Sequence, residues 1–436
     1  MDRKSRFIAT LRARADYTHA LAIVVFLVVV GYWPDILAFA VAPKWAAAAV
    51  GFAALLCWRY PLTLRGGHLI GAAFLFWATL SLAWTPVGYD GVYRWAQFLI
   101  CAAAFLAASE ADTLQPAWTA FGCAVAVSAG IAALQLAGYE PVMHIDQTPT
   151  GLFGNHDFLG HAGAVATVMA AFYGILWLLP LTLFAIAAST AKSAWLAIAV
   201  GICWLTWSWH RRLGIAVTAL TFMLLIGALA LHPVGLAIGL RLPIWHNALA
   251  QLTLAGNGIG SFHALILPYF AAPVNGVPPL IRPWHAENDF IELAFELGPI
   301  GVALFVGFVG YCLAVGSSHE RVGMLAILSL GLVSFPLGNA ATAVAFAVLA
   351  GGAARRGSAV RFHLPWRRNH HDAGAADQWP AHLPSGAIAA RSKDLPARFL
   401  HSQPVGAAAY PDDQTRPAAI RRRRDQPGAE KRPVRL

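Results

Sequence analysis

Apolar residues occur in this chain as long runs separated by short polar connections. A helix must present roughly 20 consecutive apolar residues to cross the hydrocarbon core of a membrane, with about 17 to 25 as the usual range. By this measure the sequence predicts an all-α polytopic membrane protein with about twelve transmembrane helices. The predicted spans are residues 19–37, 43–58, 68–84, 94–109, 117–137, 157–173, 174–189, 193–209, 213–231, 298–316, 322–338 and 340–354.

One long segment, residues 232–297, interrupts the apolar runs. Arginine, histidine and carboxylate side chains collect there beside a membrane, where polar groups are costly unless they have partners or a function. We therefore expect the active region in this loop. The predicted organisation is an N-terminal segment (1–18), nine spans (19–231), the large loop (232–297), three spans (298–354) and a C-terminal tail (355–436).

Basic residues between the spans indicate an orientation. Connections on the cytoplasmic side of a membrane protein are enriched in Lys and Arg. With a cytoplasmic N-terminus and an even number of spans, the arginines of the connections fall on one side: Arg59, Arg65, Arg211, Arg212, Arg321, Arg355 and Arg356. An odd number would place basic pairs on both sides, so the pattern predicts that both termini are cytoplasmic and that the large loop lies outside.

Composition supports a membrane protein and argues against nucleic-acid binding. The chain is 58% hydrophobic and only 12% charged, whereas soluble domains are about 25% charged. Much of its net charge of +10 lies in the N-terminal segment and the tail, where it suits an anionic membrane surface. The tail is rich in Pro, Arg, Ala and Gln, and such a segment cannot bury enough apolar surface to fold. The five cysteines follow no disulfide or metal-site spacing.

Inside the loop, the sequence from Leu242 onward predicts a short amphipathic helix on the outer membrane surface. Pro243 would lie in its first turn, where proline is tolerated. Arg241, one turn before Trp245, would then be held at the height of a lipid-linked phosphate. An equal alternative is an arginine that reaches toward bulk lipid phosphate. The apolar residues at helical spacing are Ile244, Trp245, Ala248, Leu249 and Leu252.

A second helix, which leads into the next span, carries carboxylates on one face and apolar residues on another. Asp289, Glu292 and Glu296 follow the spacing i, i+3 and i+7, which places them along one side of a helix. Such acids are costly near a membrane unless they face a wet cavity. The alternative is a solvated helix start, where acids interact favourably with the helix dipole.

Three smaller features have both a functional and an ordinary interpretation. Lys192 stands alone between two apolar runs, and is either a functional cation or a turn residue. Asp157 and His161 have the spacing of a metal pair on one helix, but no third ligand is near in sequence, so a polar span end is the better interpretation. Gly256–Gly260 superficially matches a dinucleotide loop, yet no strand precedes it. We expect a turn there that lets the loop fold back.

Taken in order, these pieces resemble the O-antigen ligase and O-antigen polymerase superfamily of bacterial inner-membrane glycosyltransferases. The resemblance covers roughly residues 145–310. Its motifs are Gly151–Leu159 before a span, the cation Lys192, Arg241–Trp245, Gly256–Phe262 and Asn288–Gly298.

This resemblance implies transfer of a glycan from an undecaprenyl-diphosphate carrier to an acceptor hydroxyl on the periplasmic side. The acceptor would be a lipid A-core or a growing glycan, and neither a nucleotide sugar nor a metal or other cofactor is implied. Lys192 and Arg241 match family arginines that hold the carrier diphosphate, and Arg282 is a further candidate contact. Lysine lacks the two-pronged geometry of arginine. The supporting residues would be Trp245, Asn155, Asn288 and Glu296.

The general base is open between two residues. The family's His-Asn pair falls on Glu287–Asn288, and His285 lies two residues upstream. Either side chain can activate the acceptor hydroxyl for attack on the anomeric carbon, which a direct displacement would invert. A free histidine has a pKa of about 6.5 and a free glutamate about 4.3. His285 is therefore favoured, because its pKa is closer to the operating pH.

Other functions are compatible with the same residues. Within the class, the chain could polymerise repeat units or transfer a glycan to protein. A transporter or flippase for lipid-linked glycans would also need a cationic cavity, but such proteins are typically built from paired halves with midplane sites. A non-catalytic membrane scaffold for polysaccharide assembly is a third class.

Overall fold

The computed structural model describes residues 3–34, 38–59, 63–142, 148–231, 237–270 and 280–357. The predicted tail lies outside these residues, apart from its first three. Within the described part the fold is helical, with one antiparallel pair of two-residue strands, β1 (Tyr269–Phe270) and β2 (Leu280–Ile281). The α-helices are α1 (Arg3–Val30), α2 (Ala42–Arg59), α3 (Gly66–Leu80), α4 (Gly88–Ser109), α5 (Gln115–Leu136), α6 (His156–Phe172), α7 (Leu179–Ser189), α8 (Lys192–Trp209), α9 (Arg211–Leu231), α10 (Ala237–Ala250), α11 (Phe262–Leu265), α12 (Asp289–Val315), α13 (Ser318–Gly331) and α14 (Ala340–Ala354). Short 3₁₀ turns are η1 (Ser81–Ala83), η2 (Leu176–Leu178) and η3 (Pro336–Gly338).

The all-helical class predicted from the apolar pattern is confirmed, and an α-helix overlaps each of the twelve predicted ranges. Among the described residues, four helical stretches are long and apolar enough to cross a membrane. They are Gly66–Ala83, Gly88–Ser109, Gln115–Leu136 and Asp289–Val315. The count of twelve spans stays a prediction.

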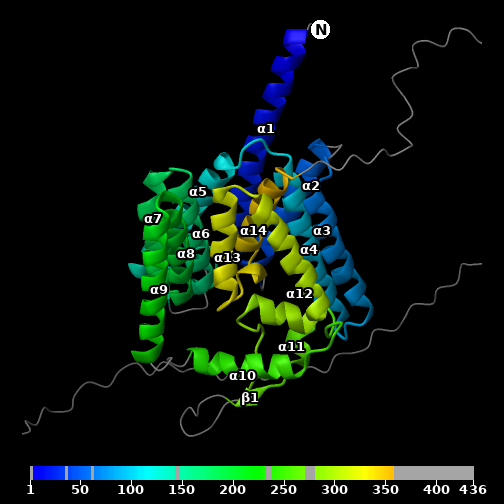
Figure 1. The fold of residues 1–436 in the computed structure, drawn as a ribbon, viewed down its shortest axis with the longest axis vertical. Coiled ribbons are helices and arrows are strands. Elements are labelled where there is room, and N and C mark those ends of the chain that lie inside the picture. The colour runs from blue at the N-terminus through cyan, green and yellow to red at the C-terminus, as the bar shows by residue number, and fades with distance from the viewer. Residues whose placement is uncertain are drawn as a thin grey trace, which may run out of the picture. The chain divides into compact units, whose positions relative to one another are not determined.

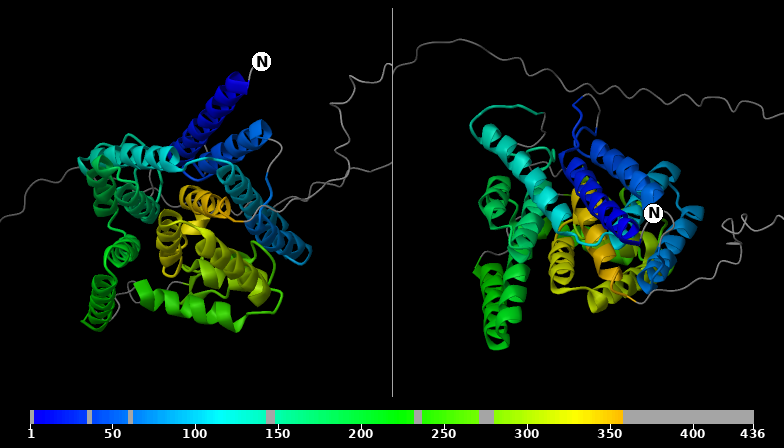
Figure 2. Two further views of the ribbon diagram at one scale, coloured as in Figure 1. Left: turned by 45° about the horizontal axis from the view of Figure 1, so that its top comes forward. Right: turned by 90° about the horizontal axis from the view of Figure 1, so that it is seen from above.

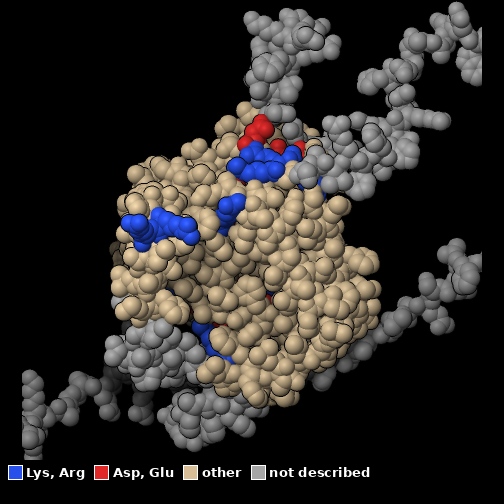
Figure 3. All heavy atoms as spheres, viewed as in Figure 1, with Lys and Arg blue, Asp and Glu red and all other residues tan. Residues whose placement is uncertain are grey.

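Successive long helices run alternately between two ends of the bundle (Figure 1). At one end, Arg355 donates from Nη1 to Ala111 O at 2.6 Å, and His319 Nε2 lies 3.1 Å from Phe172 O. The first contact joins the connection after α4 to the end of α14, and the second joins the start of α13 to the end of α6. We call this the basic end, because on the face seen in Figure 3 most Lys and Arg side chains lie toward it.

Other connections gather at the opposite end, which we call the loop end because α10, α11 and the strands lie there (Figure 1). Lys44, at the start of α2, is almost fully buried and donates from Nζ to Gly31 O at 2.7 Å and to Leu152 O at 3.0 Å. Thr85 donates from Oγ1 to Ile259 O at 2.9 Å. The loop is therefore tied to the connections between the helices.

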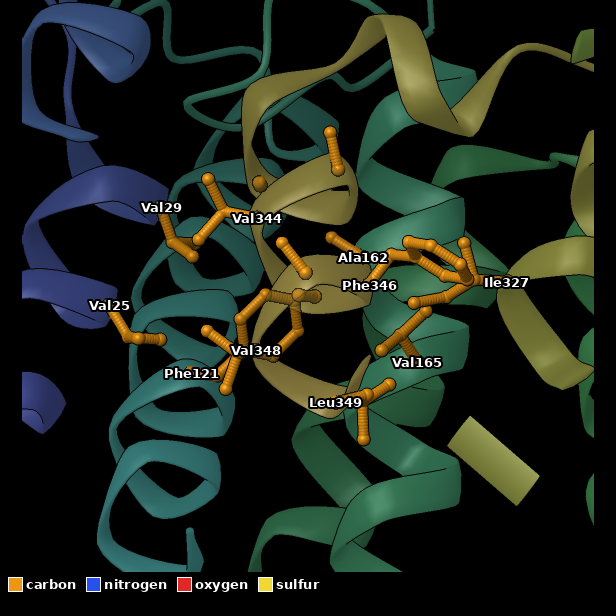
Figure 4. Packing of buried hydrophobic residues seen from close by; sticks show 14 of the residues in the cluster. Val25, Val29, Phe121, Ala162, Val165, Ile327, Val344, Phe346, Val348 and Leu349 are labelled. Atoms are coloured by element: carbon orange, nitrogen blue, oxygen red, sulfur yellow. The ribbon is translucent and has the colours of Figure 1, made fainter. Parts of the chain in front are cut away.

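Helix α14 forms the centre of the core, as Figure 2 shows in orange. Every residue of α14 is buried, and a helix buried on all sides is expected to be apolar all round. Its alanines and glycines allow close approach, since a Cβ on Gly351 would lie 2.3 Å from Phe105 O. Figure 4 shows its larger side chains, Val344, Phe346, Val348 and Leu349, between residues of α1, α5, α6 and α13.

The loop docks against a kink in α12. Gly298 has φ 68° and ψ 178°, which divides α12 into a short first part and a long second part that begins with Pro299. The kink leaves carbonyl groups of the first part without helical partners. The turn predicted at Gly256–Gly260 is present and supplies donors, because Asn257 N–H donates to Phe295 O at 2.9 Å and Gly258 N–H to Glu296 O at 3.0 Å.

The predicted start of α10 was wrong. The helix begins at Ala237, so Pro243 lies inside it and not in its first turn. Proline there removes one helical hydrogen bond, but the turn before it is also helical. The predicted apolar face is also only partly correct, since Ile244 and Ala248 are buried whereas Leu249 is half exposed.

The docking of the loop at the kink predicts that a side chain at Gly298 destabilises the folded protein. In Gly298→Ala the residue keeps a backbone conformation that essentially only glycine adopts and that costs other residues about 1–3 kcal/mol, and its Cβ would lie 2.3 Å from Leu254 O. The purified protein should therefore melt at a lower temperature. Gly307→Ala, in the second part of the same helix, is the control because its Cβ would meet nothing within 4 Å. An equal loss in both variants would contradict the close docking.

Candidate functional site

Three carboxylates on the first part of α12 are buried at the loop end. Asp289, Glu292 and Glu296 are only 6%, 3% and 4% exposed. The one-sided spacing predicted from the sequence is correct, but the alternative of a solvated helix start is wrong. The acids face protein, where an uncompensated carboxylate is strongly disfavoured.

Arg94, in the second turn of α4, faces this acidic stripe. Its Nη2 lies 3.6 Å from Glu292 Oε1, Nη1 donates to Gln97 Oε1 at 3.1 Å, and the guanidinium lies 5.4 Å from the Phe98 ring centroid. Arg94 was not among the site residues predicted from the sequence. The signal was available, because an arginine at the start of an apolar run is by default a functional candidate.

His285 is held by Glu292. Its Nδ1 lies 3.2 and 3.3 Å from the two carboxylate oxygens, and the ring stacks on Phe335 at 4.3 Å between centroids. An ionised carboxylate only accepts hydrogen bonds, so Nδ1 must carry the proton. In the neutral ring the lone pair is then on Nε2. The side chain is 36% exposed, which leaves His285 accessible for proton transfer.

The pKa of His285 reflects its burial and the charged groups around it. Burial by itself lowers the pKa of His285, but the charge of Glu292 and its hydrogen bond raise that pKa above the ordinary histidine value. The charge of Arg94 opposes this rise and that of Glu287 adds to it. His285 therefore becomes a neutral base only at a higher pH than a free histidine does.

Glu287 and Arg241 form a second, more open pair. Arg241 Nη2 lies 3.4 Å from Glu287 Oε2, and the side chains are 21% and 30% exposed. Trp245 Nε1 donates to Ala286 O at 2.7 Å and so holds α10 beside this segment. Glu287 has φ 54°, an unusual conformation for a residue other than glycine. Burial raises the pKa of Glu287, against the opposing charge of Arg241.

Two predicted supporting asparagines are helix caps. Asn155 Oδ1 accepts from Asp157 N–H at 2.8 Å at the start of α6. Asn288 Oδ1 accepts from the first N–H groups of α12, at 3.0 and 3.1 Å, while its Nδ2 donates to Leu332 O at 2.8 Å. Such caps contribute typically about 1 kcal/mol each. Asn288 thus fixes α12 relative to the end of α13.

Of the remaining predicted site residues, Glu296 is buried on α12, whereas Lys192 and Arg282 are exposed. Glu296 Oε1 accepts from Phe262 N–H at 3.3 Å and so ties α12 to α11. Lys192 is the exposed first residue of α8, and its neighbour Ser193 bonds His161 Nε2 at 2.9 Å. Arg282 is exposed just after β2. Among the described contacts, none joins Lys192 or Arg282 to His285 or Arg241.

Arg94 and the three acids of α12 form what we call the charged cluster. An apolar cavity of about 290 Å³ lies beside it. It is lined mainly by side chains of α3, α4, α12 and α14. Gln97, which accepts from Arg94, lines the cavity, and so does Leu337, whose N–H donates to Asp289 Oδ2 at 3.0 Å. The cavity therefore borders the cluster directly.

Comparisons with known proteins do not assign this chain to a family, because no family model and no curated protein matches it. Among the described residues, no group of three or more His, Cys, Asp or Glu side chains is placed to hold a metal ion.

Proposed function

We propose that this protein is a glycosyltransferase of the O-antigen ligase type. It moves a glycan from undecaprenyl diphosphate to an acceptor hydroxyl at the periplasmic face of the bacterial inner membrane. One observation supports the proposal most directly. Arg241 and Glu287 are distant in sequence, yet Arg241 Nη2 lies 3.4 Å from Glu287 Oε2, and Glu287 is only two residues from His285. A phosphate-binding cation and two candidate bases thus share one site at the end of an apolar helix bundle.

The orientation follows from the charges of the two ends. The basic end faces the cytoplasm, because arginines are retained on that side of a membrane. The chain crosses the membrane twelve times, with both termini in the cytoplasm, and the loop end is periplasmic. Nucleotide sugars are scarce outside the cytoplasm, which favours a lipid-linked donor.

The cations act on the leaving group. Arg241 presents a planar fork suited to phosphate oxygens, and the side chain of its present partner Glu287 is 30% exposed. A diphosphate, with more negative charge, displaces that carboxylate. Lys192 adds a point charge from the start of α8. Positive charge aimed at the departing diphosphate lowers the barrier as negative charge develops there.

His285 acts as the general base. Its Nε2 takes the proton of the acceptor hydroxyl, whose oxygen attacks the anomeric carbon while the bond from that carbon to the diphosphate oxygen breaks. This single displacement inverts the anomeric centre and releases undecaprenyl diphosphate. Glu287 pairs with Arg241 until the diphosphate binds and displaces it.

The apolar cavity supports a lipid substrate. A hydrocarbon chain gains about 25 cal/mol for each Å² of apolar surface removed from water, and this cavity borders the charged cluster. The polar groups gather at one end of the bundle and not at the midplane of paired halves, which favours group transfer over transport.

The phosphate role predicts that cations at the loop end are essential. Lys192→Ala and Arg241→Ala should each lower glycan transfer at least about 100-fold with the membrane level of the protein unchanged. Lys192→Arg should retain activity, because charge and reach survive. Arg212→Ala, an exposed arginine at the start of α9, is the control and should be fully active. Transfer is measured with purified protein and a lipid-linked donor, and an active Arg241→Ala would contradict the role.

The base assignment predicts different outcomes for the two candidates. His285→Ala should remove turnover, whereas Glu287→Gln should leave measurable activity. The rate of the wild-type protein should fall as the pH drops through the raised pKa of His285, so the acidic limb should lie above the ordinary histidine value of about 6.5. Inactive Glu287→Gln together with active His285→Ala would show that Glu287 is the base.

A further inference from the structure

We propose that Glu292 and Arg94 are positioning residues that hold His285 in one tautomer and set the pH at which its Nε2 accepts a proton. The role in turnover rests on the proposed function. The control of the imidazole does not, because it follows from contacts in the substrate-free protein.

Glu292 is held by partners in three directions. Besides His285 Nδ1, Ala286 N–H donates to Oε2 at 2.9 Å, and Arg94 Nη2 lies 3.6 Å from Oε1. The side chain is only 4% exposed, so water does not compete for these oxygens. An ionised carboxylate fits all three partners, and their contacts hold it against the imidazole.

The charges around His285 favour its protonated form, because nearby acids outnumber nearby cations. Asp289, Glu292 and Glu296 are buried on α12, and Arg94 from α4 faces them. Glu287 adds a further acid on the segment that carries His285. Opposite charges within about 4–6 Å favour the charged form of a group. A protonated His285 thus gives Glu292 a second cation, as the reaction requires when the base has accepted a proton.

A purely structural role makes a different prediction. A salt bridge that only held α4 against α12 would affect folding when broken, but it would leave the titration of His285 unchanged in any folded variant. The two single-charge changes also act in opposite directions on His285. Loss of the Glu292 charge removes its anion, whereas loss of the Arg94 charge removes a competing cation.

The test measures the imidazole directly, without substrate. Full-length protein in detergent is treated with diethyl pyrocarbonate, which modifies neutral histidine, and modification of His285 is followed by peptide mass spectrometry against pH. The wild-type midpoint should lie above about 6.5. Glu292→Gln, which retains the shape and an acceptor oxygen, should lower it by about one pH unit or more. Glu292→Asp should restore most of the shift, and Arg94→Gln should raise the midpoint.

Glu296→Gln is the matched control, because it removes an equally buried carboxylate one turn away that does not contact His285. Its midpoint should stay near wild type. An unchanged midpoint in Glu292→Gln, an equal fall in Glu296→Gln, or a lower midpoint in Arg94→Gln would overturn the proposal. If Arg94→Gln does not fold, the two Glu292 variants still decide it.

The acidic limb of the transfer rate should move together with the modification midpoint in the same variants. Shifted midpoints in a protein that transfers no glycan would leave the positioning role intact and refute the proposed function. Normal glycan transfer with unshifted midpoints would refute the positioning role and leave the proposed function intact.

Discussion

Compensated burial of charge is the constraint on which the loop end depends. Three carboxylates on one face of α12, about one helical turn apart, are buried. Removing even one carboxylate from water is costly unless it has partners. Arg94 supplies the opposing charge from α4, and backbone N–H groups of Ala286, Phe262 and Leu337 each donate to one of the acids. The same bonds that neutralise the stripe therefore hold α4, α11, α12 and the connection before α14 together.

This arrangement explains why the chemistry lies where the helices end. The kink at Gly298 turns the first part of α12 away from the long apolar second part. Its carbonyl groups are then satisfied by the turn around Asn257, and its acids face Arg94. His285 and Glu287 precede this helix directly, so the contacts that stabilise the kink also position both candidate bases. Removing one partner of such a buried network costs about 3–5 kcal/mol.

Local patterns in the sequence predict much of this fold. Apolar length predicted a helix in each of twelve ranges, and the spacing of Asp289, Glu292 and Glu296 predicted one face. The glycines at 256–260 predicted a turn. These features depend on residues close together in the chain. Pro243 was misplaced because the proline rule describes an isolated helix start and not a turn that extends upstream of it.

The partners across the fold were not predictable in the same way. Arg94 and Glu292 are far apart in sequence, and no periodicity relates α4 to α12. The roles of Asn155 and Asn288 as caps also needed backbone geometry, since asparagine is favoured both at helix N-caps and in turns. His285 was favoured from its ordinary basicity alone. Its contact with Glu292 gives the physical reason for its tautomer, and it also raises the pH at which it acts.

The proposed glycan transfer can be tested by deleting this protein in its native host and analysing surface glycans and lipid-linked intermediates. We expect the glycan to be lost from its acceptor, and the undecaprenyl-diphosphate-linked form to accumulate on the periplasmic side of the inner membrane. Unchanged surface glycan without accumulation, or accumulation confined to the cytoplasmic side as after loss of a flippase, would show that the protein does not transfer the glycan.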